Sequence, residues 1–307
     1  MRHRLEYFAI LFAARFVQLF PSSLSRRLLS NIGLLYYYLS RRFREVALTN
    51  LKRVYPDRAD EEKRKNIAKG SFRNLGRLLF DILRLEKLAV EDLESQAEII
   101  GWENLKRGYD RGKGVLLFSA HFGNWELVAL LQGFRGYRLH MITRPLDNPY
   151  LERYLDRIRT RFGNKVVHKT GAIRKCRKAI RDGEGIAIVI DQSVPPDQAV
   201  MVDFLGHPAW TTQTLAKLAL RFGCAVVPVF SLPTASGRYR IVYEPEVALP
   251  SSGDTEKDIR DLTQDCTRVI ERYIKEYPEY WFWMHRRWRV EAREGLLEPP
   301  RQVSADD

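Results

Sequence analysis

The chain has 307 residues, of which 45% are hydrophobic, and it carries a formal net charge of +13. These values fit one large globular domain or two ordinary ones and exclude a largely disordered chain. The three cysteines are far apart and lack a CxxC pair, which argues against a disulfide framework or a cysteine zinc site and favours a reducing compartment.

The positive charge is concentrated in two stretches of the chain. Residues 1–53 and residues 152–182 each hold a surplus of eight positive charges. Two basic surfaces of this kind suit anionic partners, namely phospholipid headgroups, phosphorylated substrates, acidic proteins or nucleic acid. The alternative is that each stretch is a solvated charged face.

Residues 1–40 are predicted to form helices that lie in or dip into one leaflet of a membrane. The apolar segment 5–20 is too long for the core of a signal peptide and is interrupted by Arg15. It is also shorter than the ~20 apolar residues that a spanning helix needs. Pro21 ends this helix, and a second apolar stretch at 28–39 follows, flanked by arginine pairs. The alternative is a pair of core helices that cap a soluble domain.

An α/β domain is expected after this segment. Residues 41–92 read as further helices, and from about residue 98 short β-rich runs alternate with helical patterns. This alternation predicts a mixed, largely parallel sheet flanked by helices. Strands are expected at 115–119, 138–142, 165–168, 185–190, 225–230 and 239–243, and helices at 125–133, 147–162, 171–182, 211–222 and 254–277. The predicted parts are a membrane-associating segment at 1–40, a helical lead-in with the α/β domain at 41–290, and a tail at 291–307.

The segment from His121 to Glu126, HFGNWE, comes directly after the first predicted strand. Ligands of open α/β sheets bind outside the carboxyl ends of the strands. Gly123 permits a tight turn and Asn124 is a favoured N-cap, so Glu126 would stand in the first helical turn and reach back to the imidazole. A carboxylate on one ring nitrogen fixes the tautomer and stabilises the imidazolium. The alternatives are a polar residue at a strand end and an acid that compensates the helix dipole.

HFGNWE resembles the H-x4-[D/E] motif of the membrane acyltransferase superfamily, and its FGNWE form resembles the branch of bacterial lipid A late acyltransferases. Three further blocks, at 143–163, 191–230 and 277–289, resemble blocks of that branch in the same order. The resemblance implies a fold like that of glycerol-3-phosphate acyltransferase. It also implies that His121 is the general base, that Glu126 orients it, and that an acceptor hydroxyl attacks the carbonyl of an acyl thioester.

Other polar residues in these blocks are candidates for substrate binding. Arg144 follows a predicted strand, and Arg159 and Arg161 close the helix after it and match an Arg-x-Arg pair of the family. Arginine suits bidentate phosphate binding, although Arg159 also fits a helix C-terminus. Asp191 and Gln192 follow the strand at 185–190 and would bind acceptor hydroxyls, or else cap the start of a loop.

The tract YWFWMHRRWR at 280–289 mixes aromatic and basic residues. Such a mixture suits a bilayer interface, a surface that stacks nucleic-acid bases, or the end of a core helix. We expect some of Trp281, Trp283 and Trp288 to belong to the core.

The expected function is transfer of a fatty acyl chain to a hydroxyl of an anionic glycolipid such as a lipid A precursor. The resemblance implies acyl carrier protein as donor, an acidic protein that suits a basic surface, with coenzyme A as the alternative. Membrane lipids and the glycolipid acceptor are further expected partners, and nucleic acid is not. No cofactor and no metal are expected, because the six histidines are scattered and no HExxH pair occurs.

The expected location is the cytoplasmic face of the inner membrane. The cysteine usage, the flanking arginines and a donor made in the cytoplasm all favour it. Three alternatives stay open: a phosphatidylinositol mannoside or another lysolipid as acceptor, a thioesterase that uses water, and a basic membrane-binding protein without catalysis.

Overall fold

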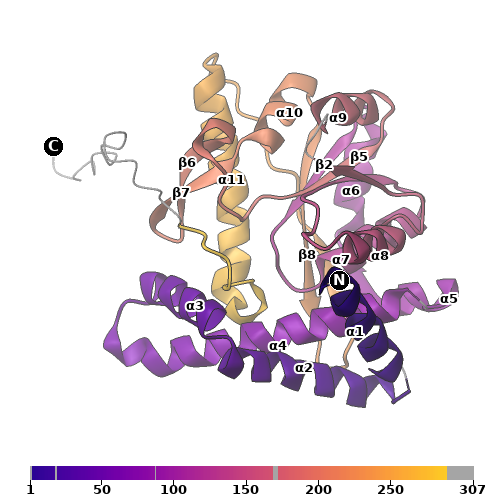
Figure 1. Cartoon of the computed structure of the whole chain (residues 1–307). Helices are drawn as coiled ribbons and strands as arrows, with labels where there is room; N and C mark the ends of the chain where they lie inside the picture. Colours follow the sequence, from indigo (N-terminus) through magenta and orange to yellow (C-terminus); the bar gives the residue numbers. More distant parts are fainter. Residues whose placement is uncertain (1, 18, 87, 169–171, 289–307) are drawn as a thin grey trace.

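The structure, a computed structural model, describes residues 2–17, 19–86, 88–168 and 172–288, so the predicted tail at 291–307 lies outside the described residues. Within them, an α/β body rests on a layer of helices from the N-terminal third of the chain (Figure 1). The helices are α1 (Arg2–Val17), α2 (Ser22–Leu39), α3 (Arg41–Val54), α4 (Glu61–Leu85), α5 (Val90–Leu93), α6 (Trp102–Asp110), α7 (Trp125–Phe134), α8 (Pro149–Arg159), α9 (Ala172–Arg181), α10 (Thr214–Phe222) and α11 (Thr255–Glu276).

A seven-stranded sheet with the order β1-β9-β8-β2-β5-β3-β4 is the centre of the described α/β body. Its neighbours are parallel, apart from the antiparallel pair of β8 and β9. The prediction of a mixed, largely parallel sheet is therefore confirmed. The strands are β1 (Ala97–Ile100), β2 (Val115–Ser119), β3 (Leu139–Thr143), β4 (Lys165–His168), β5 (Gly185–Val189), β8 (Ala225–Pro233) and β9 (Tyr239–Tyr243), and a separate antiparallel pair contains β6 (Ala199–Phe204) and β7 (His207–Thr212).

Strand β2 is buried along its whole length because helices cover both faces of the sheet. Leu116 and Phe118 pack on one face with residues of α9, α10 and α11. Val115 and Leu117 pack on the other with residues of α6, α7 and α8. Alternate residues of a strand point to opposite faces, so one apolar run serves two cores.

The helices begin where the sequence supplies a cap. The Asn124 side chain accepts the Leu127 N–H at 3.0 Å, as expected for the N-cap of α7. Asn148 caps α8, with Pro149 in the first turn. Asp254 caps α11 through the Glu256 and Lys257 N–H groups.

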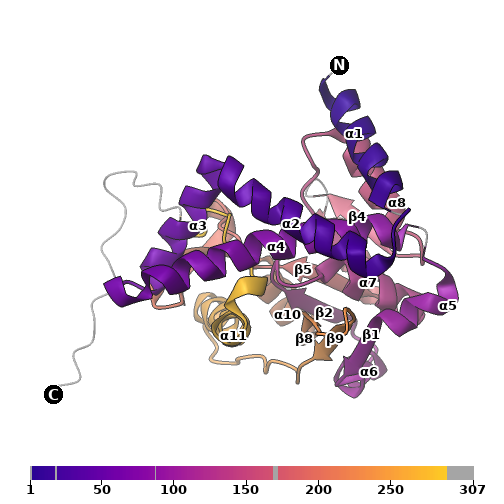
Figure 2. The same ribbon diagram turned by 90° about the horizontal axis from the view of Figure 1, so that it is seen from below.

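Helices α2 and α4 lie side by side beneath the sheet (Figures 1 and 2). They approach closely at two glycines. A Cβ added to Gly33 would lie 2.1 Å from the Phe72 carbonyl oxygen, and one added to Gly76 would lie 2.0 Å from that of Leu29. The arrowhead of β8 points towards α4, and β2 runs parallel to β8, so the carboxyl end of β2 faces this layer.

Helices α1 and α2 expose many large apolar side chains, although the inner face of α2 is packed. Leu29, Gly33 and Tyr37 of α2 are buried. Helix α1 contacts α8, where the Asn148 amide donates to the His3 carbonyl and to Glu6. No helix in the described ranges has both the length and the apolar composition that a bilayer crossing requires. We call the exposed residues Leu5, Phe8, Phe12, Phe16, Leu24, Leu28, Ile32 and Leu35 the apolar strip.

The structure differs from the predicted elements in two places. The sequence did not predict β1 or the hairpin of β6 and β7, which turns at Leu205 and Gly206, both with positive φ. The helix expected at 211–222 begins only at Thr214, because Thr211 and Thr212 end β7 opposite β6. Threonine is β-branched and favours a strand, and the buried Arg287 guanidinium also bonds to Thr211.

Candidate active site

Two neighbouring strand ends bring His121 and Asp191 together. Strands β2 and β5 are parallel, and Ser119 pairs with Val189 at the end of the ladder. His121 and Asp191 each lie two residues farther along, so the register places them opposite each other. Asp191 Oδ1 lies 2.9 Å from His121 Nδ1, and Oδ2 accepts the His121 backbone N–H at 3.0 Å.

Asp191 is a buried carboxylate that stays ionised. Its residue is only 2% exposed, and Oδ2 also accepts the Trp281 indole N–H at 2.8 Å. Burial by itself raises the pKa of Asp191, but the charge of His121 and the hydrogen bonds from His121 and Trp281 outweigh it and lower the pKa to about 2. An ionised partner makes His121 Nδ1 the hydrogen-bond donor, which leaves Nε2 free to accept a proton.

The imidazole of His121 is partly exposed and its surroundings are aromatic. Its side chain is 22% exposed. The Trp125 ring stands edge-on to it with centroids 5.1 Å apart, and the Phe282 ring lies at 6.4 Å. The Gln192 amide nitrogen lies 3.5 Å from His121 Nε2. The imidazole therefore lies beside one polar side chain and two aromatic rings.

Glu126 forms an ion pair with Arg159. It is 4% exposed in the first turn of α7, and the Arg159 Nε–H donates to it at 2.9 Å while Nη2 bonds to its other oxygen. Burial alone would lower the pKa of Arg159, but the charge of Glu126 and the hydrogen bonds to it outweigh burial and raise the pKa, so the guanidinium stays charged. Between His121 and Glu126, both described, the structure contains no hydrogen bond, and the carboxylate on the His121 ring is that of Asp191.

Backbone hydrogen bonds hold the turn that carries His121 against residues 280–282. The Gly123 N–H donates to the Tyr280 carbonyl at 3.0 Å, and the Phe282 N–H donates to the His121 carbonyl at 3.0 Å. Gly123 has φ +58°, and a Cβ there would lie 1.7 Å from the Ser231 carbonyl oxygen, so this position requires glycine.

The aromatic residues of the 280–289 tract belong to the core. Trp281, Trp283 and Trp288 are all buried, as expected of some of them. Side chains of the helical layer hold the tract: Ser71 donates to the Trp281 carbonyl at 2.6 Å and Asn50 to the Trp283 carbonyl at 2.8 Å. The three tryptophans are therefore part of the core and are not available to a bilayer or to stacked bases.

The predicted phosphate-binding arginines have different surroundings. Arg144 is exposed just beyond β3. Arg161 is also exposed, but it donates to the Leu85 carbonyl at 2.9 Å and to the Leu88 carbonyl at 2.7 Å, which secures the end of α4. Arg159 is bound to Glu126, so Arg144 is the one of these three arginines whose guanidinium makes no hydrogen bond or ion pair with the described residues.

A cavity of about 490 Å³ lies between α1 and α8. Its wall combines aromatic rings and arginines, and His121 is not part of it. The lining residues are Tyr7, Tyr150, Arg153, Tyr154, Asp156, Arg157 and Thr160.

Comparison with known proteins gives one consistent result. A model of the bacterial lipid A biosynthesis acyltransferase family matches residues 1–290. The chain is 24% identical to a lipid A biosynthesis acyltransferase of Haemophilus influenzae, over 86% of this chain and 81% of that protein. It is 26% identical to the lipid A biosynthesis lauroyltransferase of Escherichia coli, over 88% and 87% of the two chains. It is also 26% identical to a phosphatidylinositol mannoside acyltransferase of Mycolicibacterium smegmatis, over 73% and 72%.

Proposed function

The chain belongs to the bacterial lipid A biosynthesis acyltransferase family, and we propose that it transfers a fatty acyl chain from an acyl thioester to a hydroxyl of a lipid A precursor, with His121 as general base. The observation that carries this proposal is the pair of His121 and Asp191 at the carboxyl ends of β2 and β5. An imidazole with a buried carboxylate on Nδ1 and a free Nε2 is suited to accept the proton of a hydroxyl.

The proposed reaction has two steps. The acceptor hydroxyl gives its proton to His121 Nε2 while its oxygen attacks the thioester carbonyl and forms a tetrahedral oxyanion. The oxyanion collapses, the carbon–sulfur bond breaks, and the leaving thiolate takes the proton back from the imidazolium. Asp191 stabilises the imidazolium between the two steps. The N–H groups of the first turn of α7, next to His121, are suited to stabilise the oxyanion.

Glu126 has a supporting role in this proposal. Its ion pair with Arg159 joins the first turn of α7 to the last turn of α8. Because His121 precedes α7 by only four residues, this link holds the base and the helix N-terminus in a fixed relation. Asp191 takes the orienting role that the spacing of the H-x4-E motif had assigned to Glu126. The Gln192 amide beside Nε2 supports a role for Gln192 in binding the acceptor.

The donor and the acceptor are anionic in this proposal. Acyl carrier protein is an acidic protein, and the basic stretch 152–182 suits it, with acyl-coenzyme A as the alternative donor. Arg144 is the leading candidate to bind an acceptor phosphate, because its guanidinium is exposed beyond β3. The alternative acceptor is a phosphatidylinositol mannoside, which the name of the mycobacterial relative favours.

We further propose that the enzyme works at the cytoplasmic face of the inner membrane. The apolar strip of α1 and α2 exposes large side chains, among them Phe12 at 73% and Leu5 at 62%. Exposed apolar side chains on two neighbouring helices of the sequence, with arginines among them, suit the boundary of headgroups and acyl chains. The carboxyl end of the sheet faces the same helical layer, so membrane lipid would meet the enzyme on the side of His121.

Lipid mass spectrometry tests the proposed function. A bacterial host that lacks its own late lipid A acyltransferases would receive either the wild-type gene or the His121→Ala variant. Wild type should add one acyl chain to the lipid A precursor, and the variant should not. Purified enzyme would then be assayed with acyl carrier protein and coenzyme A thioesters on lipid A precursor and on phosphatidylinositol mannoside. Full acylation by the His121→Ala variant would refute the mechanism.

A further inference from the structure

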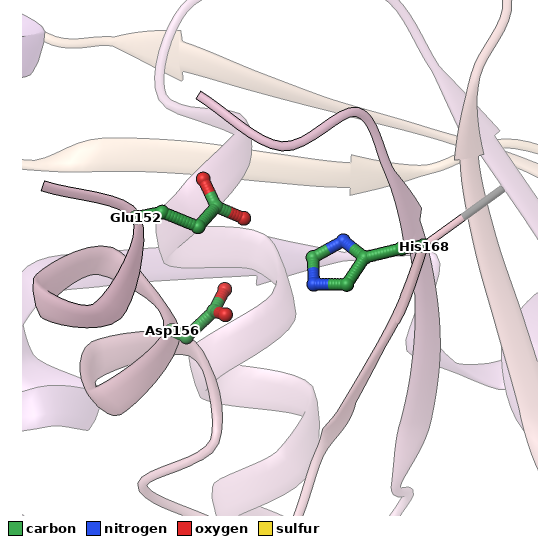
Figure 3. A group of neighbouring side chains, drawn as sticks. All are labelled: Glu152, Asp156 and His168. Atoms are coloured by element: carbon green, nitrogen blue, oxygen red, sulfur yellow. The ribbon is translucent and has the colours of Figure 1, made fainter. Parts of the chain in front are cut away.

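Three side chains outside the His121 site point towards one another at the edge of the sheet (Figure 3). Glu152 and Asp156 are four residues apart on α8 and so lie on one face of that helix. His168 ends β4 and turns a ring nitrogen towards them. One ligand atom of each of the three residues lies within 4.8 Å of the others.

The cluster holds oxygen atoms that other protein groups leave unused. Glu152 is 8% exposed, and its Oε2 accepts the Leu146 N–H at 2.7 Å, while its buried Oε1 has no hydrogen-bond partner among the described residues. Oδ1 of Asp156 is likewise buried without a hydrogen-bond partner in the described part of the chain. A buried carboxylate oxygen without a partner is costly, and a cation is the partner that satisfies two at once.

The arginine that contacts Asp156, Arg159, is already engaged elsewhere. Arg159 Nη1 lies 4.0 Å from Asp156 Oδ1, beyond hydrogen-bond distance. The same guanidinium makes its close contacts with Glu126. Arg159 therefore offsets only part of the negative charge on Glu152 and Asp156. A bound ion would lie closer to both carboxylates than Arg159 does.

We propose that Glu152, Asp156 and His168 bind a divalent transition-metal ion, Zn²⁺ or Mn²⁺. One imidazole nitrogen with two carboxylates is a ligand set that both ions accept. Ligand atoms at ~2.1 Å from a tetrahedral ion stand about 3.4 Å apart, so the three ligand atoms, now within 4.8 Å of one another, must approach by at most about 1.4 Å, which rotation of side chains can supply. The Asp156 side chain is 28% exposed and lines the cavity between α1 and α8, which supplies a path for the ion.

A bound ion would join two elements that otherwise meet through side-chain packing. Glu152 and Asp156 belong to α8, whereas His168 belongs to β4, whose neighbour β3 holds it by the pairing of Thr143 with His168. The ion would also draw Asp156 away from Arg159 and leave that guanidinium entirely to Glu126. The site thus supports the position of α8 without touching His121.

Metal binding is to be measured directly on the full, untagged chain. Protein in detergent is stripped with a chelator, and Mn²⁺ is then titrated while the electron paramagnetic resonance signal of free Mn²⁺ is followed. Zn²⁺ is titrated calorimetrically in parallel. Wild type should bind one ion per chain and should unfold at a higher temperature with the ion than without it.

The variants Glu152→Gln, Asp156→Asn and His168→Ala should each weaken binding about tenfold or more. Glu152→Gln keeps an oxygen for the Leu146 N–H, so its fold is expected to persist, which circular dichroism of the metal-free protein verifies. Glu184→Gln is the matched control, because Glu184 also contacts a histidine, His140, but is neutralised by Lys165. Failure of wild type to bind an ion at submillimolar concentration, or equal binding by the cluster variants and the control, would overturn the proposal.

Discussion

The indole of Trp281 donates a hydrogen bond at 2.8 Å to the carboxylate of Asp191, ninety positions earlier in the chain. The same Oδ2 also accepts the backbone N–H of His121, and Oδ1 faces the imidazole. The carboxylate thus has three donors from two distant segments. Its position is fixed before any substrate arrives, which is the condition for orienting a base.

The first prediction separates Asp191 from Glu126. Asp191→Asn should lower kcat by about 10²–10⁴-fold, because an amide neither stabilises the imidazolium nor fixes the donor tautomer. Glu126→Gln should lower kcat less and mainly reduce thermal stability, since it breaks an ion pair with Arg159. Rates at saturating thioester check the effect on kcat, and melting temperatures check the effect on stability. Asp182→Asn, which alters an exposed ion pair with Lys178, is the control. A larger kcat loss in Glu126→Gln than in Asp191→Asn would return the orienting role to Glu126.

The second prediction concerns acid stability. The folded pKa of Asp191, about 2, is lower than the ~3.9 of an unfolded aspartate. The ionised carboxylate of Asp191 therefore stabilises the folded state by on the order of 2 kcal/mol above pH ~4, and this stabilisation is lost as the pH falls towards 2. Denaturant unfolding of wild type and Asp191→Asn should differ most near pH 5–6 and converge towards pH 2. A difference that stays constant across this range would mean that Asp191 is not held as a carboxylate.

The third prediction concerns the crossing of α2 and α4. Gly33→Ala or Gly76→Ala should destabilise the protein by about 1–3 kcal/mol, because the new Cβ meets a backbone carbonyl at about 2 Å and the helices must separate. Asn31→Ala on the exposed side of α2 is the control and should be neutral or slightly stabilising. Thermal unfolding measures all three. If the glycine variants were as stable as the control, the close packing of α2 on α4 would be wrong.

The fourth prediction concerns the membrane. Replacement of Phe8, Phe12, Leu28 and Ile32 by serine should release the protein from vesicles that contain anionic lipid, while activity on detergent-dispersed acceptor is better preserved. Ile100→Ser with Leu146→Ser removes exposed apolar side chains outside the strip and should change nothing. Sedimentation with vesicles, before and after a salt wash, is the measurement. Undiminished sedimentation of the fourfold variant would exclude the apolar strip as the anchor.

The fifth prediction separates the two exposed arginines. Arg144→Ala should raise KM about tenfold for a phosphorylated acceptor and little for its dephosphorylated form, because a charge-assisted contact is lost only with the former. Arg161→Ala should lower stability and slow both reactions equally, because the Leu85 and Leu88 carbonyls lose their donor. Steady-state kinetics of both variants with the phosphorylated and the dephosphorylated acceptor distinguish these two roles. Equal losses for both acceptors in Arg144→Ala would remove its phosphate role.

The sheet was largely predictable because its strands carry continuous apolar runs. Strands β2, β4 and β9 have the predicted bounds. Strands β6 and β7 mix polar and apolar residues outside the main sheet, so they gave no clear periodic signal. A buried parallel strand is simpler to recognise than a short hairpin.

The candidate site was predictable in its residues but not in its pairings. His121, Asp191, Glu126 and Arg159 were all singled out, yet local spacing favoured Glu126 as the partner of His121. The actual partner depends on the register of β2 against β5, and the partner of Glu126 on the packing of α8 against α7. Neither is a local property. Trp281 had no recognisable role because its donor function exists only once the tract has folded against Asp191.

The contacts that hold the His121 turn have a consequence for biogenesis. Residues 277–288 leave the ribosome after every strand of the sheet has been made, and domains acquire structure from the N-terminal side during synthesis. Until this tract arrives, the N–H of Gly123 lacks the Tyr280 carbonyl and Asp191 lacks the Trp281 indole. A nascent chain can thus complete its sheet while its base is still poorly held. The final positioning of His121 and Asp191 therefore follows completion of the sheet, and a chain that ends before residue 280 would keep the sheet but lose these contacts.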